Sequence, residues 1–160
     1  MSQTGGRQKT KSAGRRLESI RTANSGAAKK SRTVRMEDYI EVIYELVEQK
    51  GYAATTDISG CLNVSLPSVT KMMKKLAGTG HLEYERYRGV RLTPEGVAIA
   101  KSIRERHSLL TEFFRIIGIQ DSIANEDAEG IEHHLHPETM ARLKEHVRQL
   151  KNGKTLVAQK

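Results

Sequence analysis

Several residue types are scarce in this sequence: its 160 residues include one cysteine, two phenylalanines and no tryptophan. The single cysteine, Cys61, excludes an intramolecular disulfide and is typical of reducing compartments, so we expect a cytoplasmic protein. No run of 18 or more apolar residues is present, which predicts that no segment spans a membrane. The polar N-terminus also lacks the apolar segment of a secretory signal. Because aromatic residues are few, Leu, Ile, Val and Ala must provide most of the core.

Acidic residues are nearly absent from the first 35 residues. This segment holds ten Lys or Arg and one acid, Glu18, for a net charge of +9, and since the whole chain carries +8 the remainder sums to −1. The segment is rich in small and polar residues and cannot bury enough surface to fold alone, so we expect a disordered basic arm over residues 1–35. Such an arm is typical of a nucleic-acid contact, although a solubilising tail is the alternative.

Two hydrophobic periodicities follow the arm. Helical spacing of apolar residues extends over residues 36–49, 56–62, 65–76, 94–117, 122–135 and 138–150. Between residues 82 and 92 the period changes to two, with a turn at Arg88-Gly89, which predicts a small β-hairpin. Ser65 can cap the third helix, with Pro67 in its first turn, and Thr93 and Pro94 can play the same roles after the hairpin.

This order of elements predicts a mainly α protein with a small β-hairpin wing. We expect a winged helix-turn-helix domain over residues 36–98 and a helical domain over residues 99–150. The final residues, 151–160, are expected to form a flexible tail.

The helix over residues 65–76 has the composition of one that enters the major groove. An apolar stripe faces inward, whereas small hydroxyl residues and lysines face outward. The hydroxyls can approach base edges or phosphates, and the lysines can neutralise phosphates. For any one cation, simple solvation is the alternative. The residues that we expect to contact double-stranded DNA are Ser65, Pro67, Ser68, Thr70, Lys71, Lys74 and Lys75, and in the hairpin Arg86, Arg88 and Arg91.

Four acids and two histidines stand out by their spacing. They are Asp38, Glu41, His107, Glu129, Glu132 and His133. The first two lie three residues apart on one predicted helix, and the last three share one face of another. Taken alone, the first pair could form a solvated face, and His107 could be a core histidine bonded to a backbone carbonyl. The Glu-x-x-Glu-His run is harder to explain in this way, because stacked acids repel one another unless a cation offsets their charge.

The charges of these six residues support a single metal site. Four carboxylates and two neutral imidazoles sum to −4, which two divalent cations would neutralise. A ligand set dominated by oxygen, with some imidazole, favours Mn²⁺ or Fe²⁺ over metals that prefer thiolate. We therefore expect two ions of Mn²⁺ or Fe²⁺, and we expect His134, His136 and His146 to lie outside the site.

Several segments resemble the manganese-sensing branch of the diphtheria-toxin-repressor (iron-dependent repressor) family over about residues 36–148. The similar segments are Met36-Glu-Asp-Tyr-Ile-Glu41, Ser68-Val-Thr-Lys71, Tyr87-Arg-Gly-Val90, Leu92-Thr93, Glu105-Arg-His107 and Asp127-Ala-Glu-Gly-Ile-Glu-His-His134. The resemblance implies a homodimer with N-terminal winged-helix domains and a C-terminal helical dimerisation domain. It also implies a binuclear Mn²⁺ site between them, made by the same six residues. Metal-loaded dimers of this family typically repress manganese uptake genes by binding operator DNA.

Two other function classes compete with this interpretation. A di-metal carboxylate oxidase needs two Glu-x-x-His motifs and two further glutamates on four facing helices. This chain has at most one such motif and uses its first half for a winged helix, so we expect no enzymatic activity. A winged-helix regulator that senses a small molecule would bind DNA with or without metal. Metal-dependent DNA binding therefore distinguishes a metal-sensing regulator from this alternative.

Overall fold

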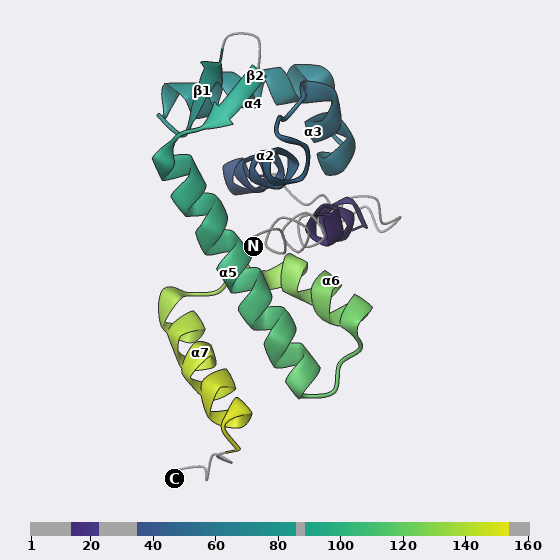
Figure 1. Ribbon diagram of the computed structural model, residues 1–160, viewed down its shortest axis with the longest axis vertical. Helices are drawn as coiled ribbons and strands as arrows, with labels where there is room; N and C mark the ends of the chain where they lie inside the picture. The colour runs from purple at the N-terminus through teal and green to yellow at the C-terminus, as the bar shows by residue number, and fades with distance from the viewer. Residues whose placement is uncertain (1–13, 23–34, 86–88, 154–160) are drawn as a thin grey trace, which may run out of the picture. The chain divides into compact units, whose positions relative to one another are not determined.

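The computed structural model describes residues 14–22, 35–85 and 89–153. The chain forms two compact units, Met1–Ser102 (unit 1) and Ile103–Lys160 (unit 2) (Figure 1). After a short N-terminal helix over residues 14–22, the elements in chain order are α2 (Met36–Lys50), α3 (Thr55–Leu62), α4 (Leu66–Gly78), β1 (Leu82–Glu85), β2 (Gly89–Leu92), α5 (Pro94–Ile116), α6 (Asp121–Ile131) and α7 (Pro137–Lys151).

Unit 1 is organised around one apolar core, to which α2, α3 and α4 all contribute. Among its most deeply buried side chains are Ile43 of α2, Ile58 of α3 and Leu76 of α4. The helix-turn-helix pair α3–α4 is joined by Asn63, whose left-handed backbone (φ 52°) ends α3. Ser65 then caps α4 by accepting a hydrogen bond from the backbone N–H of Ser68, as the sequence predicts.

The two strands form an antiparallel hairpin, with Leu82 opposite Leu92. Both of these leucines are buried in the core of unit 1, so the hairpin is held against the helices by one face. The chain enters α5 through Thr93, whose hydroxyl accepts from the backbone N–H of Gly96 and donates to the carbonyl of Gly80. A Cβ at Gly96 would overlap the carbonyl oxygen of His81, so this close approach requires glycine.

The N-terminal helix differs from the expected disordered arm. Residues 14–22 are helical, and Leu17 and Ile20 are each 2% exposed as members of the unit 1 core. These two apolar residues, three apart on one helical face, supply the burial that the overall composition of the arm concealed. The rest of the arm, residues 1–13 and 23–34, and the end of the chain, 154–160, lie outside the described residues.

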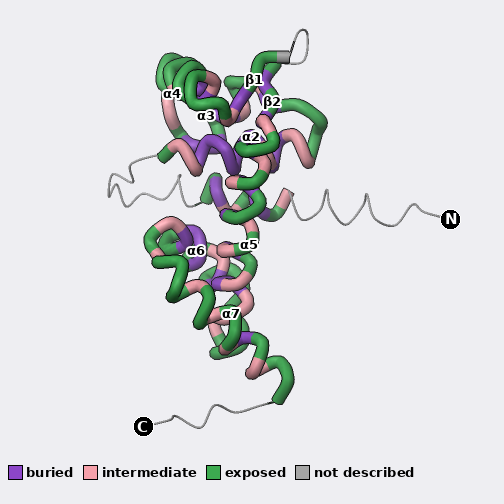
Figure 2. Tube along the Cα trace, turned by 90° about the vertical axis from the view of Figure 1, so that its left-hand side faces the viewer, coloured by how far each residue is buried: buried purple, intermediate pink, exposed green. Residues whose placement is uncertain are grey.

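Unit 2 contains α6, α7 and the C-terminal part of α5. Its buried apolar residues are fewer than those of unit 1, and they are Ile103, Leu110, Ala124, Ala128 and Val147. Figure 2 shows buried and exposed positions mixed along α6. Gly118, with φ 91°, turns the chain after α5. Ile117, the last residue of the helix that we predicted over residues 94–117, lies beyond the end of α5 and is exposed.

Helix α6 is shorter than the expected helix over residues 122–135. It ends at Ile131, and Glu132 is its C-terminal cap residue with helical backbone angles. Gly130 weakens the last turn, and the N–H of His134 bonds to the carbonyl of Ile131 in a tighter turn of the chain. Across the described segments, no helix combines the length and apolar character needed to cross a membrane.

Candidate metal centre and DNA-binding surface

A buried polar cluster lies in unit 2. His107, Glu129 and Glu132 each offer one ligand atom, and these three atoms lie within 4.8 Å of one another. All three residues are buried. The ring of His107 is held at both nitrogens: Nδ1 lies 2.8 Å from Oε2 of Glu132, and Nε2 lies 3.3 Å from Oδ1 of Asn125. The cluster therefore combines two carboxylates and one oriented imidazole in a region removed from water.

Local structure explains how the cluster forms. His107 lies on α5 between the buried residues Ile103 and Leu110, on the face that the helical spacing predicts. Glu129 follows the buried Ala128 in the last turns of α6, and Glu132 keeps helical angles as the cap residue, so the i, i+3 stacking of the two acids survives the early end of the helix. Both ring nitrogens of His107 contact side-chain oxygens, which differs from the single bond to a backbone carbonyl that the alternative requires.

His133 is placed differently from our prediction. We expected it on the same helix as Glu129 and Glu132, whereas it lies in the turn that follows α6. Its Nε2 is nevertheless 3.4 Å from Oε1 of Glu132, and its side chain is almost fully buried. The turn thus places His133 beside the carboxylate of Glu132, a contact that helical spacing alone does not predict.

The donor set of this cluster fits a divalent cation. Two carboxylates and one imidazole lie close together and buried, and burial of charged groups is costly unless other charges or hydrogen bonds offset it. Two oxygen donors and one nitrogen donor suit Mn²⁺ or a similar ion. Asn125, which the sequence analysis missed, orients the imidazole. Its spacing of four residues before Glu129 was the signal that could have identified it.

In unit 1, Asp38 and Glu41 are buried rather than solvated, and so is Glu45 one turn further along α2. Asp38, in the first turn of α2, accepts a hydrogen bond of 2.6 Å from the backbone N–H of Arg35. Burial and the Asp38 carboxylate raise the pKa of the neighbouring Tyr39 hydroxyl. The simple alternative of a solvated acidic face is therefore wrong for this side of α2.

Glu41 has a cationic partner that the sequence analysis missed. The Nε of Arg16, on the N-terminal helix, donates to Oε1 of Glu41 at 2.7 Å, and a terminal guanidinium nitrogen also contacts this oxygen. The exposed fractions of the two side chains are 6% and 2%, so this is a buried ion pair. Leu17 and Ile20, at helical spacing beside Arg16, were the signal that this part of the arm packs against the core.

Helix α4 exposes to solvent the residues that we predicted to contact DNA, and Figure 2 colours most of its residues as exposed. The predicted contact residues on it are all exposed: Ser65, Pro67, Ser68, Thr70, Lys71, Lys74 and Lys75. Val69, Met73 and Leu76 face the core. The arrangement presents hydroxyl groups near the start of the helix and ammonium groups further along it, as base and phosphate contacts require.

Three details refine this surface. The hydroxyl of Thr70 donates to the carbonyl of Leu66, which leaves its oxygen lone pairs to accept from a base. Leu66, which the sequence analysis did not single out, is 47% exposed at the start of α4 and could pack on a thymine methyl group. In the hairpin Arg91 is exposed, whereas Arg86 and Arg88 lie outside the described residues.

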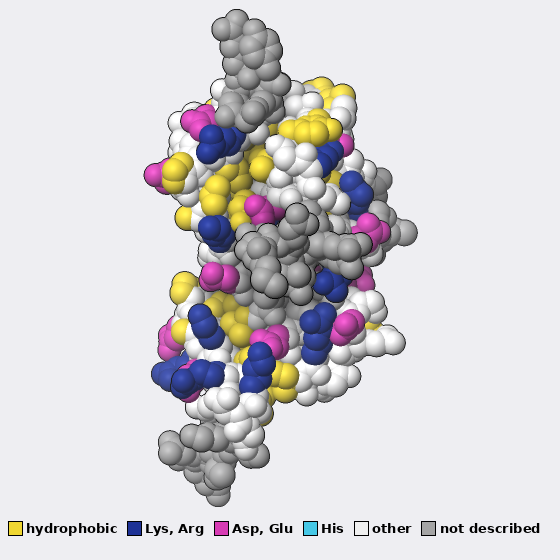
Figure 3. Space-filling view, viewed as in Figure 1, with side chains coloured by type: hydrophobic (Ala, Val, Ile, Leu, Met, Phe, Trp, Pro, Cys, Tyr) yellow, Lys and Arg dark blue, Asp and Glu magenta, His cyan; other side chains and the backbone are white. Residues whose placement is uncertain are grey.

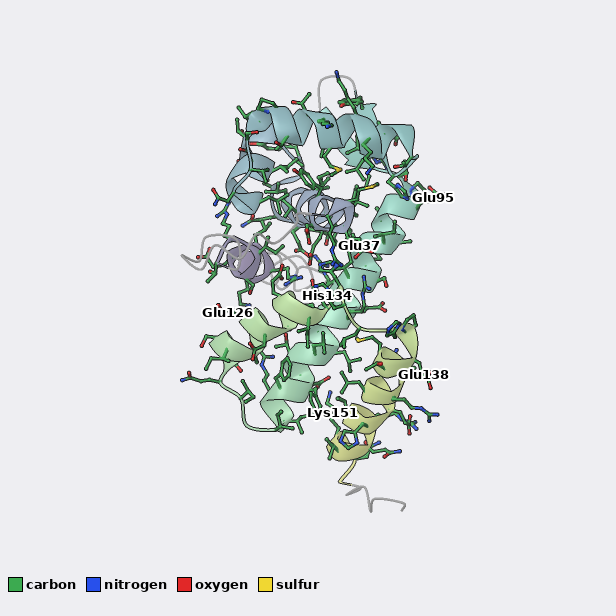
Figure 4. The ribbon with its side chains drawn as sticks, turned by 180° about the vertical axis from the view of Figure 1, so that it is seen from behind. Glu37, Glu95, Glu126, His134, Glu138 and Lys151 are labelled. Carbon is green, nitrogen blue, oxygen red and sulfur yellow. The ribbon has the colours of Figure 1, made fainter. Side chains whose placement is uncertain are left out.

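Surface charges elsewhere are mixed. On the face in Figure 3, Lys and Arg side chains are interspersed with Asp and Glu, and no histidine of the described residues is visible. His134, labelled in Figure 4 after the end of α6, and His136 are both exposed. Neither belongs to the buried cluster of unit 2.

Family comparisons match nearly the whole of the chain after its arm. Residues 32–90 match the family described as "Iron dependent repressor, N-terminal DNA binding domain". Residues 93–153 match "Iron dependent repressor, metal binding and dimerisation domain". The boundary between the two matches falls at the start of α5.

Curated relatives agree with these matches. The chain is 45% identical over 125 residues to "HTH-type transcriptional regulator MntR" of Shouchella clausii, covering 78% of this chain and 87% of the relative. It is 53% identical over 103 residues to the protein of that name from Bacillus pumilus, covering 64% of this chain and 72% of the relative.

Solved structures share the fold. "Crystal structure of T. acidophilum IdeR" has 37% identity and a TM-score of 0.64, covering 72% of this chain and 55% of that one. "Structure of the manganese regulator SloR" has 29% identity and a TM-score of 0.64, covering 72% and 54%. This chain thus spans just over half the length of these two solved proteins.

Proposed function

This chain belongs to the iron-dependent repressor family, and from that premise we propose that it is a manganese-responsive repressor that binds operator DNA as a homodimer in the cytoplasm. The observation that carries the proposal is the buried set of His107, Glu129 and Glu132, with three ligand atoms within 4.8 Å of one another. A regulator that sensed an organic molecule would have no need of this buried pair of carboxylates.

Manganese is the proposed metal because the donors are hard oxygens and imidazoles. Thiolates and thioethers, which favour softer metals, are absent from the six proposed ligands. The curated relatives carry the name MntR, and one solved structure is titled a manganese regulator. We propose a binuclear site, to which Asp38, Glu41 and His133 contribute together with the buried set of unit 2.

The residues of the chain would act on the metal in distinct ways. Glu129 and Glu132 supply charge, His107 supplies a nitrogen, and Asn125 holds the imidazole ring in position through Nε2. When bound, the ions would neutralise carboxylates that otherwise repel one another. Since Asp38 and Glu41 belong to α2 of the DNA-binding unit, shared metal ligation would restrict the freedom of that unit and favour one spacing of two recognition helices.

Dimerisation through unit 2 is supported by apolar side chains that remain exposed there. Ile116, Ile117, Ile123 and Ile131 are between 36% and 54% exposed. Large apolar side chains that are exposed on a single subunit are candidates for a protein interface. The family match of residues 93–153 to a dimerisation domain points to the same use.

Titration of operator binding with Mn²⁺, Fe²⁺ and Zn²⁺ in turn tests the proposal. We expect tight operator binding with Mn²⁺, and only weak, salt-sensitive binding after chelation. Operator binding of equal strength with and without metal would contradict the proposal and favour a metal-independent winged-helix regulator. Equal activation by Zn²⁺ alone would overturn the preference for manganese while leaving metal dependence intact.

A further inference from the structure

We propose that Arg16 is an internal cation that occupies Glu41 in the metal-free protein and competes with Mn²⁺ for it. The inference rests on the proposed function, because it takes Glu41 as a metal ligand. The N-terminal helix lies outside the six predicted ligands and outside the family matches, which begin at residue 32. One residue of this helix would nevertheless influence metal binding. The helix would thereby set how much metal is needed to activate the protein.

The geometry of the pair supports this role. The Nε of Arg16 lies 2.7 Å from Oε1 of Glu41, and a terminal nitrogen of the same guanidinium contacts the same oxygen. Both side chains are more than nine-tenths buried. Charge-assisted contacts of this kind are stronger than neutral hydrogen bonds, and burial reduces their screening by water and salt. Arg16 therefore occupies one of the two oxygens that Glu41 could offer to a metal.

Arg16 is held in position by the helix that carries it. Leu17 and Ile20 of this helix are buried in the unit 1 core. Further along, the Nε of Arg21 donates to Sγ of Cys61 at 3.4 Å, which attaches the end of the helix to α3. The neighbouring Arg15 is exposed. The pairing is thus specific to one of two adjacent arginines, rather than a general attraction of the basic arm to an acidic surface.

The consequence follows from electrostatics. A guanidinium held at Oε1 repels a divalent ion that approaches the same carboxylate, since the two cations would lie close together. Metal binding at Glu41 must therefore either displace the guanidinium or overcome this repulsion, and both costs lower the apparent metal affinity. In the absence of metal the guanidinium balances a buried carboxylate that would otherwise destabilise the fold.

The test compares Arg16→Met with Arg15→Met in the full-length protein without DNA. Methionine keeps much of the apolar stem of the side chain and removes its charge. Calorimetric titration with Mn²⁺ should show Arg16→Met binding at least about fivefold more tightly than the wild type, the lower end of typical couplings between two sites. Arg15→Met removes the same charge from the same helix without the contact, so its affinity should change by less than about twofold, well below a typical coupling.

Thermal melting separates competition from a purely structural role. Arg16→Met should melt at a lower temperature than the wild type without metal, and this difference should shrink when Mn²⁺ is saturating, because the metal then balances Glu41. A decrease in melting temperature that is equal with and without Mn²⁺ would overturn the proposal. So would an Mn²⁺ affinity that is unchanged or weakened.

A second variant guards against failure of Arg16→Met to fold. Arg16→Gln removes the charge but keeps a hydrogen-bond donor for Glu41, and it should also tighten Mn²⁺ binding relative to Arg15→Met. If the wild type itself binds no Mn²⁺, the proposed function fails and this inference with it. If the wild type binds Mn²⁺ and both variants match it, only the inference fails.

Discussion

The interiors of the two units differ in the proportion of apolar and polar side chains that they bury. Unit 1 encloses a continuous apolar cluster to which α2, α3, α4 and both strands contribute, and it also buries the acids Asp38, Glu41 and Glu45, of which Glu41 is paired with Arg16. Unit 2 buries fewer and smaller apolar residues, and among them lie His107, Thr111, Glu129 and Glu132. Apolar packing thus makes up most of the interior of unit 1, whereas polar and charged side chains make up a larger share of the interior of unit 2.

This difference indicates where a metal matters most for folding and for function. Apolar burial stabilises unit 1 whatever the ionic conditions. Buried carboxylates destabilise a fold unless cations or hydrogen bonds offset them, so unit 2 gains most from a bound divalent ion. Substitutions of the proposed ligands in unit 2 should consequently abolish metal-dependent operator binding. Substitutions in the core of unit 1 should alter stability, and those on its DNA-reading surface should alter DNA binding. Neither of these should change the affinity of unit 2 for metal.

The largest effect is expected for Glu132→Gln in unit 2. This change removes a charged donor from the buried set and should weaken Mn²⁺ binding by at least about 100-fold, with loss of metal-dependent operator binding. Circular dichroism of the metal-free protein should be unchanged, because an amide keeps the size of the side chain. Glu126→Gln is the control, since Glu126 is exposed on α6 (Figure 4). If Glu132→Gln binds Mn²⁺ as tightly as the wild type does, Glu132 is not a metal ligand.

Packing in unit 1 is probed by Gly96→Ala. The added methyl would meet the carbonyl oxygen of His81, a backbone atom that cannot move freely, so the free energy of unfolding should fall by about 2–3 kcal/mol. Gly60→Ala in α3 is the matched control, because open space surrounds the position, and helix propensity should raise stability by about 0.5–1 kcal/mol. Chemical denaturation measures both. Equal effects of the two substitutions would show that the approach at Gly96 is not tight.

Substitutions on α4 should distinguish residues that contact bases from residues that contact phosphates. Ser68→Ala should change the relative affinity among operator variants by about 1–3 kcal/mol, as expected for a good base contact. Lys74→Ala should weaken binding to all sequences alike and reduce its salt dependence. Neither variant should alter Mn²⁺ affinity in the absence of DNA. If both act uniformly on all sequences, the DNA-reading surface lies elsewhere.

The smallest effect is expected for deletion of residues 1–13. This deletion removes Arg7, Lys9 and Lys11 but keeps the helix over residues 14–22, whose Leu17 and Ile20 belong to the core. The slope of log affinity against log salt concentration should fall by about 0.9 for each DNA phosphate that the deleted cations neutralise, for specific and random duplexes alike. An unchanged slope would show that this part of the arm does not contact DNA.

Periodicity and turn chemistry predicted the elements of both units well, because they are local properties. The cap at Ser65 and the hairpin after Gly80 are examples. The early end of α6 was not predicted, since the weakness of Gly130 competes with a strong apolar pattern that continues past it. Gly96 was also missed, because its constraint comes from His81, which precedes it by fifteen residues.

The residues of the candidate site were likewise predicted where the signal is local and missed where it is not. Helical spacing predicted that Glu129 and Glu132 share one face, and the structure brings His107 close to both, while metal binding by the three residues stays a prediction. Asn125 and Arg16 act through contacts with residues 18 and 25 positions away, which no local pattern encodes. In the basic arm, a high net charge concealed the two buried apolar residues that fix Arg16 beside Glu41.

The central claim is that metal and operator DNA are coupled, and calorimetry of Mn²⁺ binding with and without operator tests it most directly. Linkage requires operator DNA to tighten Mn²⁺ binding by the same factor by which Mn²⁺ tightens operator binding. We expect a coupling of about 1–3 kcal/mol, which corresponds to about 5- to 150-fold in affinity. If the Mn²⁺ affinity is identical in the two titrations, the metal serves only the structure of unit 2, and the chain is not a manganese switch.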